Sequence, residues 1–267
     1  MKRLYGYTSA MELLSVLHEI DRLKSELDAL RPLSVQQVAN LKRLFDVDFT
    51  YNSTAIEGNT YTLQETRIVL LEGITIGGKS TREHLEIVNH KEAIDYIEKL
   101  SSKPLTDMSR TDILTIHHLI LKGIDTEHAG VFRDVPVYVR LKNGSIHKFC
   151  DPLKLIDEMD RYFQWFFSEK KAHPLYIAAE AHTKLVSIHP FIDGNGRTAR
   201  LLMNLILIHY GYPPAIIKVS QRSQYLDAIE CWQQTCDDRP FMQLLTDSVK
   251  ENLELYLETL KNKVIWK

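Results

Sequence analysis

The sequence has 267 residues, of which 44% are hydrophobic and 25% are charged, and its formal net charge is −2. This composition is ordinary for a globular protein and supplies enough apolar side chains to bury a core. Because the sequence lacks a strong basic excess, it argues against electrostatic binding to nucleic acid or to an anionic membrane.

The apolar runs and the cysteines bear on the compartment in which the protein works. The N-terminus leads into amphipathic sequence without an apolar stretch of the signal-peptide kind, and runs such as residues 205–208 are far too short to span a membrane. The three cysteines Cys150, Cys231 and Cys236 are odd in number and lack the spacing of a metal site. We therefore expect a cytoplasmic protein in a reducing compartment.

Helical periodicity dominates the chain. Residues 11–30 place a leucine-rich stripe on one face, and a second helix is expected from about Ser34 to Glu57, where Gly58 and Asn59 end it. Three further helices are expected to begin where a hydroxyl residue is followed three positions later by an acid, at Thr62/Glu65, Ser80/Glu83 and Ser109/Asp112. Later helical patterns cover residues 153–168, 174–188, 195–210, 221–235 and 240–263.

One segment between these helices has extended character. Residues 134–141 are typical of a strand, the pair Asn143-Gly144 is a strong hairpin signal, and residues 146–149 lead away. Without an internal repeat or a linker, the prediction is a single mainly α domain with one β-hairpin. Within it, residues 1–60 are expected to form a helical arm that packs on residues 61–267.

The chemistry is expected in the loop after the helix at 174–188. Pro190 cannot continue that helix, so the chain must turn at His189 before a second, very apolar helix begins. Gly194 and Gly196 allow the backbone to approach a ligand closely, and the amides at a helix N-terminus favour anions. The loop is therefore suited to a phosphate group.

Four charged or titratable side chains of this loop fit the same reading. Asp193 can hold a divalent cation that bridges phosphate oxygens, while Arg197 and Arg200 share a helical face and can neutralise a polyphosphate. His189 titrates near neutrality and is suited to take a proton from an attacking hydroxyl. Each residue taken alone is more often structural, but together within twelve positions they predict a catalytic site.

The loop resembles the signature of the Fic family. The run His-Pro-Phe-Ile-Asp-Gly-Asn-Gly-Arg-Thr-Ala-Arg at 189–200 fills every defined position of that signature, and the resemblance extends from about Ser53 to about Phe241. It implies a mainly α domain of the Fic (Fido) type. It also implies a protein adenylyltransferase, an enzyme that moves AMP from ATP to a Ser, Thr or Tyr hydroxyl of a target protein and releases pyrophosphate.

The resemblance implies a role for each residue of the loop. His189 would deprotonate the target hydroxyl, Phe191 would anchor the loop in the core, and Asp193 would bind Mg²⁺. The residues implied to hold the phosphates of ATP are Gly194, Asn195, Gly196, Arg197 and Arg200. Tyr225 is expected to line the adenine pocket, with a role in the core as an equal alternative.

A second motif precedes the loop by more than a hundred residues. Ser53 and Glu57 are four apart and share a helical face near a C-terminus, where a carboxylate is unfavourable unless a cation meets it. The run from Ser53 to Gly58 resembles the inhibitory motif of many Fic proteins. By that resemblance, Glu57 pairs with Arg200 and blocks productive binding of the γ-phosphate.

The hairpin and a histidine pair complete the set of candidates. Residues Val137, Tyr138 and Val139 resemble the flap of the family, which pairs with an extended target segment, and an ordinary surface hairpin is the alternative. His117 and His118 are adjacent in a helix, point in different directions, and are assigned a structural role.

Several functions stay open at this point. The same site could remove AMP, with Glu57 positioning a water, or carry out another phosphate-containing transfer. A different class is a metal-dependent hydrolase built from His182, His189 and Asp193, and another is an interaction protein without activity. The expected partners are ATP and a target protein, with neither membrane nor nucleic acid; the identity of the target and the formation of a homodimer stay open.

Overall fold

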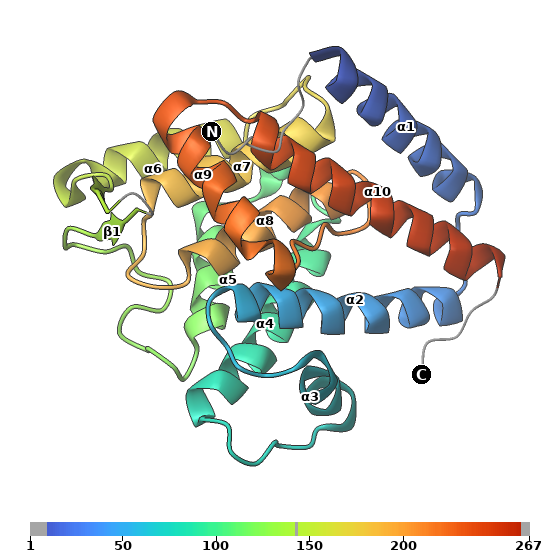
Figure 1. The fold of residues 1–267 in the computed structure, drawn as a ribbon, viewed down its shortest axis with the longest axis horizontal. Coiled ribbons are helices and arrows are strands. Elements are labelled where there is room, and N and C mark those ends of the chain that lie inside the picture. Colours follow the sequence, from blue (N-terminus) through green and yellow to red (C-terminus); the bar gives the residue numbers. More distant parts are fainter. Residues whose placement is uncertain (1–9, 142–143, 263–267) are drawn as a thin grey trace.

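The computed structural model describes residues 10–141 and 144–262. Asn143 of the predicted turn lies outside these ranges. The start of the predicted segment 1–60 and the end of the predicted segment 61–267 lie outside them as well. The described chain folds into ten α-helices and one two-stranded hairpin, so the prediction of a mainly α domain is confirmed (Figure 1). None of the described helices is long and apolar enough to cross a membrane.

The first two helices form the N-terminal arm. Helix α1 (Ala10–Ala29) packs along the C-terminal helix α10 (Arg239–Lys261) and buries most of its leucine-rich stripe. Leu14 and Leu30, predicted to lie on that stripe, are exposed. Helix α2 (Val35–Ile56) begins at a capping box on Ser34 and ends with Glu57 as its C-cap residue. Gly58 follows with a φ of 103°, a conformation that glycine adopts without strain, so the chain turns there and leaves Glu57 at the helix end.

The three predicted capping pairs are confirmed. Helix α3 (Leu63–Arg67), helix α4 (Thr81–Leu100) and helix α5 (Arg110–Leu121) each begin at a reciprocal capping box. The structure adds a π-helical turn at Ile68–Glu72, which continues α3 and which no capping or periodicity signal predicted.

The remaining helices enclose the core. Helix α6 (Pro152–Phe166) packs on α7 (Pro174–Ile188), and α7 pairs with α8 (Asn195–His209), whose residues are almost all buried. Figure 1 shows α8 near the centre of the molecule, with α2, α4, α9 (Arg222–Thr235) and α10 around it. The loop between α7 and α8 is therefore held by the two best-packed elements of the fold.

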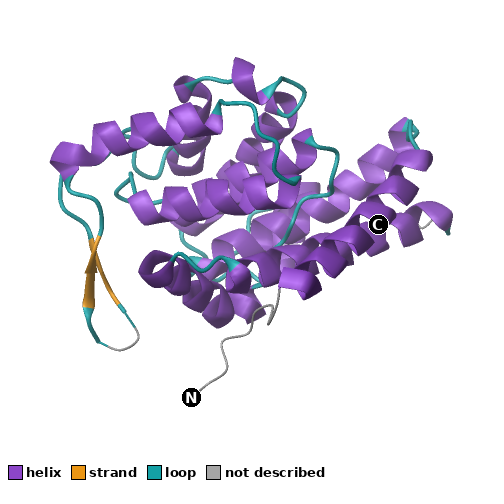
Figure 2. Ribbon diagram, turned by 90° about the horizontal axis from the view of Figure 1, so that it is seen from above, coloured by secondary structure: helices purple, strands orange, loops and turns teal. Residues whose placement is uncertain are grey.

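The hairpin lies at one side of the helical body. Strands β1 (Tyr138–Arg140) and β2 (Ile146–Lys148) pair antiparallel, with Val139 opposite His147. Figure 2 shows the hairpin projecting from the helices on two loop segments. The predicted hairpin is confirmed, although its strands are shorter than the extended segment 134–141.

Candidate active site

The loop between α7 and α8 is fixed by its own residues. His189 caps α7 in the left-handed conformation with a φ of 54°, which is uncommon for a residue with a Cβ atom. Phe191 is fully buried, and the Asn195 side chain closes the loop around it: Asn195 Oδ1 accepts from the Phe191 N–H at 3.0 Å, and Asn195 Nδ2 donates to the Phe191 carbonyl at 2.8 Å. The loop conformation is therefore set before any ligand arrives.

A residue that the sequence assigned to structure also holds this loop. The His117 ring stacks on Phe191 with 3.6 Å between ring centroids, and its Nδ1 accepts from the Gly130 N–H at 2.9 Å. Because a backbone N–H can only donate, the proton of the neutral ring lies on Nε2, which donates to the Asp193 carbonyl at 2.9 Å. His117 thus fixes the backbone of Asp193, although it is no candidate ligand.

The side chain of His189 is prepared to accept a proton. Burial is the main cause that lowers its pKa to about 4, and the Arg133 charge acts in the same direction. The Val186 carbonyl beside the ring opposes this shift, and the ring stacks on Phe149 with 4.0 Å between centroids. At neutral pH the ring is uncharged, and its second nitrogen carries a free lone pair.

Arg200 is buried and bound on several sides. Its side chain is 1% exposed, and its Nη2 donates to Glu57 Oε1 at 2.7 Å. Nε donates to the Ser53 hydroxyl at 3.0 Å, Nη2 also donates to the Ser53 carbonyl at 2.8 Å, and Nη1 donates to the Tyr225 hydroxyl at 3.0 Å. Ser53 and Tyr225 therefore orient the guanidinium, and Glu57 accepts a hydrogen bond from the remaining N–H of Nη2.

Glu57 lies over the first turn of α8. A Cβ atom on Gly196 would clash with Glu57 Oε1, so the carboxylate keeps its present position because residue 196 is glycine. The N-terminus of a helix and a buried arginine both attract an anion. The Glu57 side chain is 39% exposed and occupies the place that suits an anionic ligand.

Asp193 and Arg197 form a second charged group at the same helix end. Asp193 Oδ1 accepts from Arg197 Nη2 at 3.1 Å, and Oδ2 accepts from Arg82 Nη2 at 2.7 Å. Burial alone would raise the pKa of Asp193, but Arg197, the Gly194 N–H and Arg82 lower it overall. Asp193 is thus ionised. Arg197 is buried, and its Nε has no hydrogen-bond partner among the described residues.

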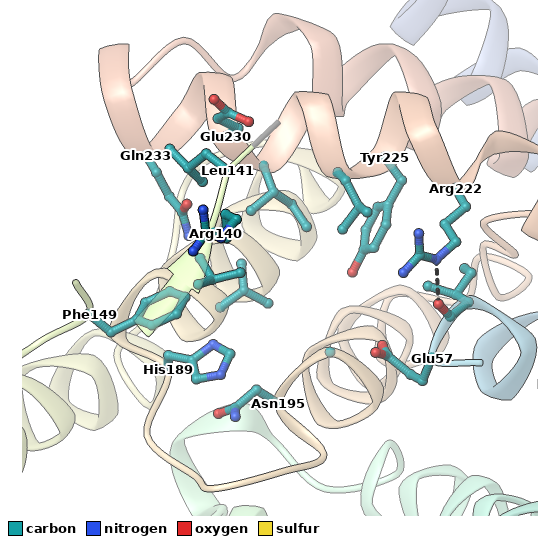
Figure 3. Close-up of a pocket in the computed structure, with 16 residues that line it drawn as sticks. Glu57, Arg140, Leu141, Phe149, His189, Asn195, Arg222, Tyr225, Glu230 and Gln233 are labelled. Atoms are coloured by element: carbon teal, nitrogen blue, oxygen red, sulfur yellow. Dashed lines mark hydrogen bonds between the residues drawn. The ribbon is translucent and has the colours of Figure 1, made fainter. Parts of the chain in front are cut away.

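A pocket of about 250 Å³ lies between His189, Glu57 and the first residues of α8. Figure 3 shows His189 and Phe149 at one end of the pocket, and Glu57, Arg222 and Tyr225 toward the other. Predicted site residues that line this pocket are Glu57, Val139, His189, Asn195, Gly196 and Tyr225. The other predicted site residues do not line it: Ser53, Val137, Tyr138, Asp193, Gly194, Arg197 and Arg200. Arg200 reaches its wall through Glu57 and Tyr225.

The alternative metal site is not assembled. His182 Nε2 lies 2.9 Å from the Tyr225 hydroxyl, and the His182 ring stacks on Phe241 rather than facing Asp193. Across residues 10–141 and 144–262, no group of three or more His, Cys, Asp or Glu side chains could hold a metal ion by itself. The link from His182 through Tyr225 to Arg200 was not predicted, because sequence spacing does not reveal a contact between α7, α8 and α9.

The helical fold, the hairpin and the histidine beside a helix N-terminus with buried arginines define a Fic-type domain. The family model described as Fic/DOC matches residues 107–207. A solved structure of Fic-1 (residues 134–508) from C. elegans is 31% identical, with a TM-score of 0.83 over 96% of this chain and 74% of that one. The chain belongs to the Fic/DOC family.

Other relatives agree with this assignment. A Fic domain containing signaling protein from Bacteroides thetaiotaomicron is 27% identical, with a TM-score of 0.86 over 93% of this chain and 98% of that one. Proteins named Protein adenylyltransferase Fic are 43% identical over 78% of this chain in Drosophila grimshawi and 39% identical over 89% in Drosophila melanogaster. The chain spans only 42% and 48% of the length of these two curated relatives.

Proposed function

We propose that the chain is a protein adenylyltransferase that moves AMP from ATP to a Ser, Thr or Tyr hydroxyl of a target protein. The observation that carries the proposal is that His189, the N-terminal turn of α8 and the Glu57–Arg200 pair meet at one pocket. The names of the curated relatives support the same activity. Incubating the Glu57→Gly variant with ATP labelled in the α-phosphate and a lysate tests it: labelled protein bands are expected, and their absence would contradict the proposal.

The reaction follows from these positions. The free ring nitrogen of His189 takes the proton of the target hydroxyl as its oxygen attacks the α-phosphorus. The bond between the α-phosphorus and the bridging oxygen breaks, and pyrophosphate leaves. The amides of Asn195 and Gly196 hold the α- and β-phosphates, joined by the Gly194 N–H once Asp193 Oδ1 releases it. Arg200 meets the γ-phosphate. Such a reaction is mostly positioning and charge stabilisation, which a rigid helix N-terminus supplies.

Buried polar groups of the loop fit a polyphosphate. Among the described residues the buried Arg197 Nε has no hydrogen-bond partner, so it is a donor that a phosphate oxygen can satisfy. The apolar wall formed by Val139, Leu226 and Ile229 suits the adenine ring, and Tyr225 lines the same pocket. The apolar wall of the pocket and the buried donor behind it together support ATP as the substrate.

Asp193 is suited to a magnesium ion. Mg²⁺ at nucleotide sites takes one or two carboxylates together with phosphate oxygens and water, and its charge would stabilise the leaving pyrophosphate. The Asp193 carboxylate is ionised and 42% exposed, and its partner Arg82 is 58% exposed and can move aside. The residues present therefore fit the ion.

Replacing Asp193 by alanine is expected to remove the dependence of ATP binding on Mg²⁺. We expect the transfer rate to fall by about 10²-fold or more, as for the loss of one preorganised charge-stabilising group, with added Mg²⁺ restoring only part of it. Calorimetric titration with ATP, with and without Mg²⁺, measures the first effect directly. Equal Mg²⁺ dependence in the parent and the variant would remove Asp193 from the metal site.

The pKa of His189 predicts the pH dependence of transfer. Only the unprotonated ring can accept a proton, and the folded protein lowers its pKa from 6.5 to about 4. The rate is therefore expected to stay level as pH falls from neutrality and to drop only near pH 4. The acid limb of kcat/KM reports this group in the free enzyme, and circular dichroism at each pH controls for unfolding. A limb centred near 6.5 would contradict the assignment.

Glu57 is the proposed inhibitor of the enzyme. It takes an Arg200 donor and lies over Gly196, so it competes with the phosphates of ATP for charge and for space. Since Ser53 and Tyr225 already orient Arg200, removing Glu57 leaves the arginine in place to receive the γ-phosphate. Residues 1–60 thus serve as the regulatory arm and residues 61–267 as the catalytic core.

The hairpin is the proposed docking site for the target. Tyr138 and Val139 are exposed, and β1 pairs with β2 on one edge only among the described residues. An extended target segment that adds to β1 beside Val137 would run past His189.

The three cysteines are unpaired, which fits the proposed cytoplasmic location.

Removal of AMP is a second candidate for the same pocket. The Glu57 carboxylate is partly exposed and lines the pocket together with His189, so it can position a water against the α-phosphorus of an AMP ester. Incubation of an AMP-modified target with the parent protein, without ATP, tests this activity. Release of AMP by the parent but not by Glu57→Gly would establish it.

A further inference from the structure

Arg133 is a buried arginine, 4% exposed, whose three side-chain nitrogens each donate to a backbone carbonyl. Nε donates to the His189 carbonyl at 2.8 Å, Nη1 to the Val135 carbonyl at 2.8 Å, and Nη2 to the Cys150 carbonyl at 2.6 Å. Burying a cation this way is costly, so such a site indicates a specific task.

The carbonyls belong to segments that the proposed reaction must hold together. Val135 lies just before β1, and Cys150 lies just after β2, so two bonds hold the two ends of the hairpin. The third bond reaches His189 itself, and the Arg133 backbone N–H donates to the Pro190 carbonyl at 3.0 Å. A planar guanidinium carries its donors on three separate nitrogens in a fixed fork, whereas the three donors of a lysine share one nitrogen.

The bond to His189 acts on a strained residue. A left-handed residue with a Cβ atom costs free energy and persists only where its surroundings hold it. The two Arg133 bonds fix the carbonyls on either side of the turn from His189 into Pro190. Phe149, next to Cys150, stacks on the His189 ring, so the base of the hairpin also touches the imidazole. The side chain of Arg133 therefore holds both the base of the hairpin and the residue that carries the imidazole.

We propose that Arg133 is a positioning residue that couples the target-binding hairpin to the general base His189. The inference rests on the proposed function, because it gives the hairpin and the base their roles. A target segment added to β1 would then present its hydroxyl to a base whose place is fixed relative to that strand. Arg133 itself touches neither ATP nor the target.

Hydrogen–deuterium exchange tests the coupling without any assay of activity. Arg133→Met keeps an apolar chain of similar length but removes every donor, and Arg133→Lys keeps the charge but not the fork. In both variants we expect exchange to rise at least about tenfold in two peptides together, one covering 135–150 and one covering 189–194. Should Arg133→Met fail to fold, Arg133→Lys carries the comparison.

Arg110 supplies the matched control. It is a partly exposed arginine that pairs with Asp160 at 3.3 Å and stacks on the Phe132 ring at 5.1 Å, without a bond to the hairpin or to the loop. Arg110→Met is expected to leave exchange in both peptides unchanged. A rise confined to one peptide, a rise in neither, or an equal rise in Arg110→Met would overturn the inference.

Transfer kinetics separate positioning from general stability. In the Glu57→Gly background we expect Arg133→Met to lower kcat by about 10²-fold, because a small misplacement of reacting groups costs this much. The charged groups that act on His189 are Arg133, Glu57 and Asp193, and Arg133 lowers its pKa. The acid limb should therefore move to higher pH in Arg133→Met but not in Arg133→Lys, which keeps the charge.

The outcomes distinguish this inference from the proposed function. If Glu57→Gly transfers no AMP at all, the proposed function fails, while the exchange experiment still decides whether Arg133 couples the two segments. If Glu57→Gly is active and Arg133→Met keeps its full kcat and an unmoved acid limb, the proposed function stands and the positioning role is wrong.

Discussion

Replacing Glu57 by glycine is expected to raise AMP transfer at least about tenfold over the parent protein. The carboxylate now holds a donor of Arg200 at 2.7 Å and lies over Gly196, where the phosphates of ATP are expected. A hydrogen bond to a charged group contributes roughly 1.5–3 kcal/mol. Because Glu57 is 39% exposed, the lower end applies, and ~1.4 kcal/mol corresponds to a factor of ten. Initial rates with labelled ATP measure the gain.

Three variants show whether the gain comes from the carboxylate. Ala55→Gly loosens the same last turn of α2 but keeps Glu57, so it should leave the protein inhibited. Glu57→Gly/Arg200→Ala should show a smaller gain, because the released donor is then absent. Glu57→Gln keeps the shape without the charge and should fall between the parent and Glu57→Gly. Equal rates in the parent and Glu57→Gly across several targets would refute inhibition by Glu57.

Replacing His189 by alanine in the Glu57→Gly background is expected to remove transfer and to keep ATP binding. General-base catalysis contributes roughly 10²–10⁴ in rate. The groups proposed to hold the phosphates lie instead at the N-terminus of α8 and on it, namely the amides of Gly194 to Gly196 and the side chain of Arg200. The affinity for ATP by calorimetry should therefore change by less than about threefold, well below the loss in rate.

A matched histidine controls for this change. His118 is exposed on α5, near the loop but outside the pocket, and His118→Ala should keep both transfer and ATP affinity. Transfer by Glu57→Gly/His189→Ala at the rate of Glu57→Gly under saturating MgATP would show that another group acts as the base. A parallel loss of ATP affinity would instead mean that His189 supports the loop rather than the proton transfer.

Local signals predicted the fold well because they act over a few residues. The capping pairs at Ser80 and Ser109 mark helix starts by a bond between a side chain and a backbone N–H three residues on. Pro190 and the glycines of the loop similarly mark where α7 ends and α8 begins. The π-helical turn at Ile68–Glu72 has no such local signature and was missed.

The predicted pairing of Glu57 with Arg200 is present in the structure, at 2.7 Å. It came from a family resemblance and not from the residues, since no local rule joins positions so far apart. The supports around the site were not predicted for the same reason. Arg133 and His117 act through backbone carbonyls of distant segments, and any sequence can supply a carbonyl. Only the folded chain reveals which carbonyl a buried side chain meets.

The position of the label in ATP tests the central claim most directly. Purified Glu57→Gly is incubated with a lysate and ATP that is labelled either in the α-phosphate or in the γ-phosphate, and protein-bound label is counted. Transfer of AMP predicts label on protein from the α-position alone, with none from the γ-position and none in Glu57→Gly/His189→Ala. Label from the γ-position, or label from the α-position that persists without His189, would contradict it.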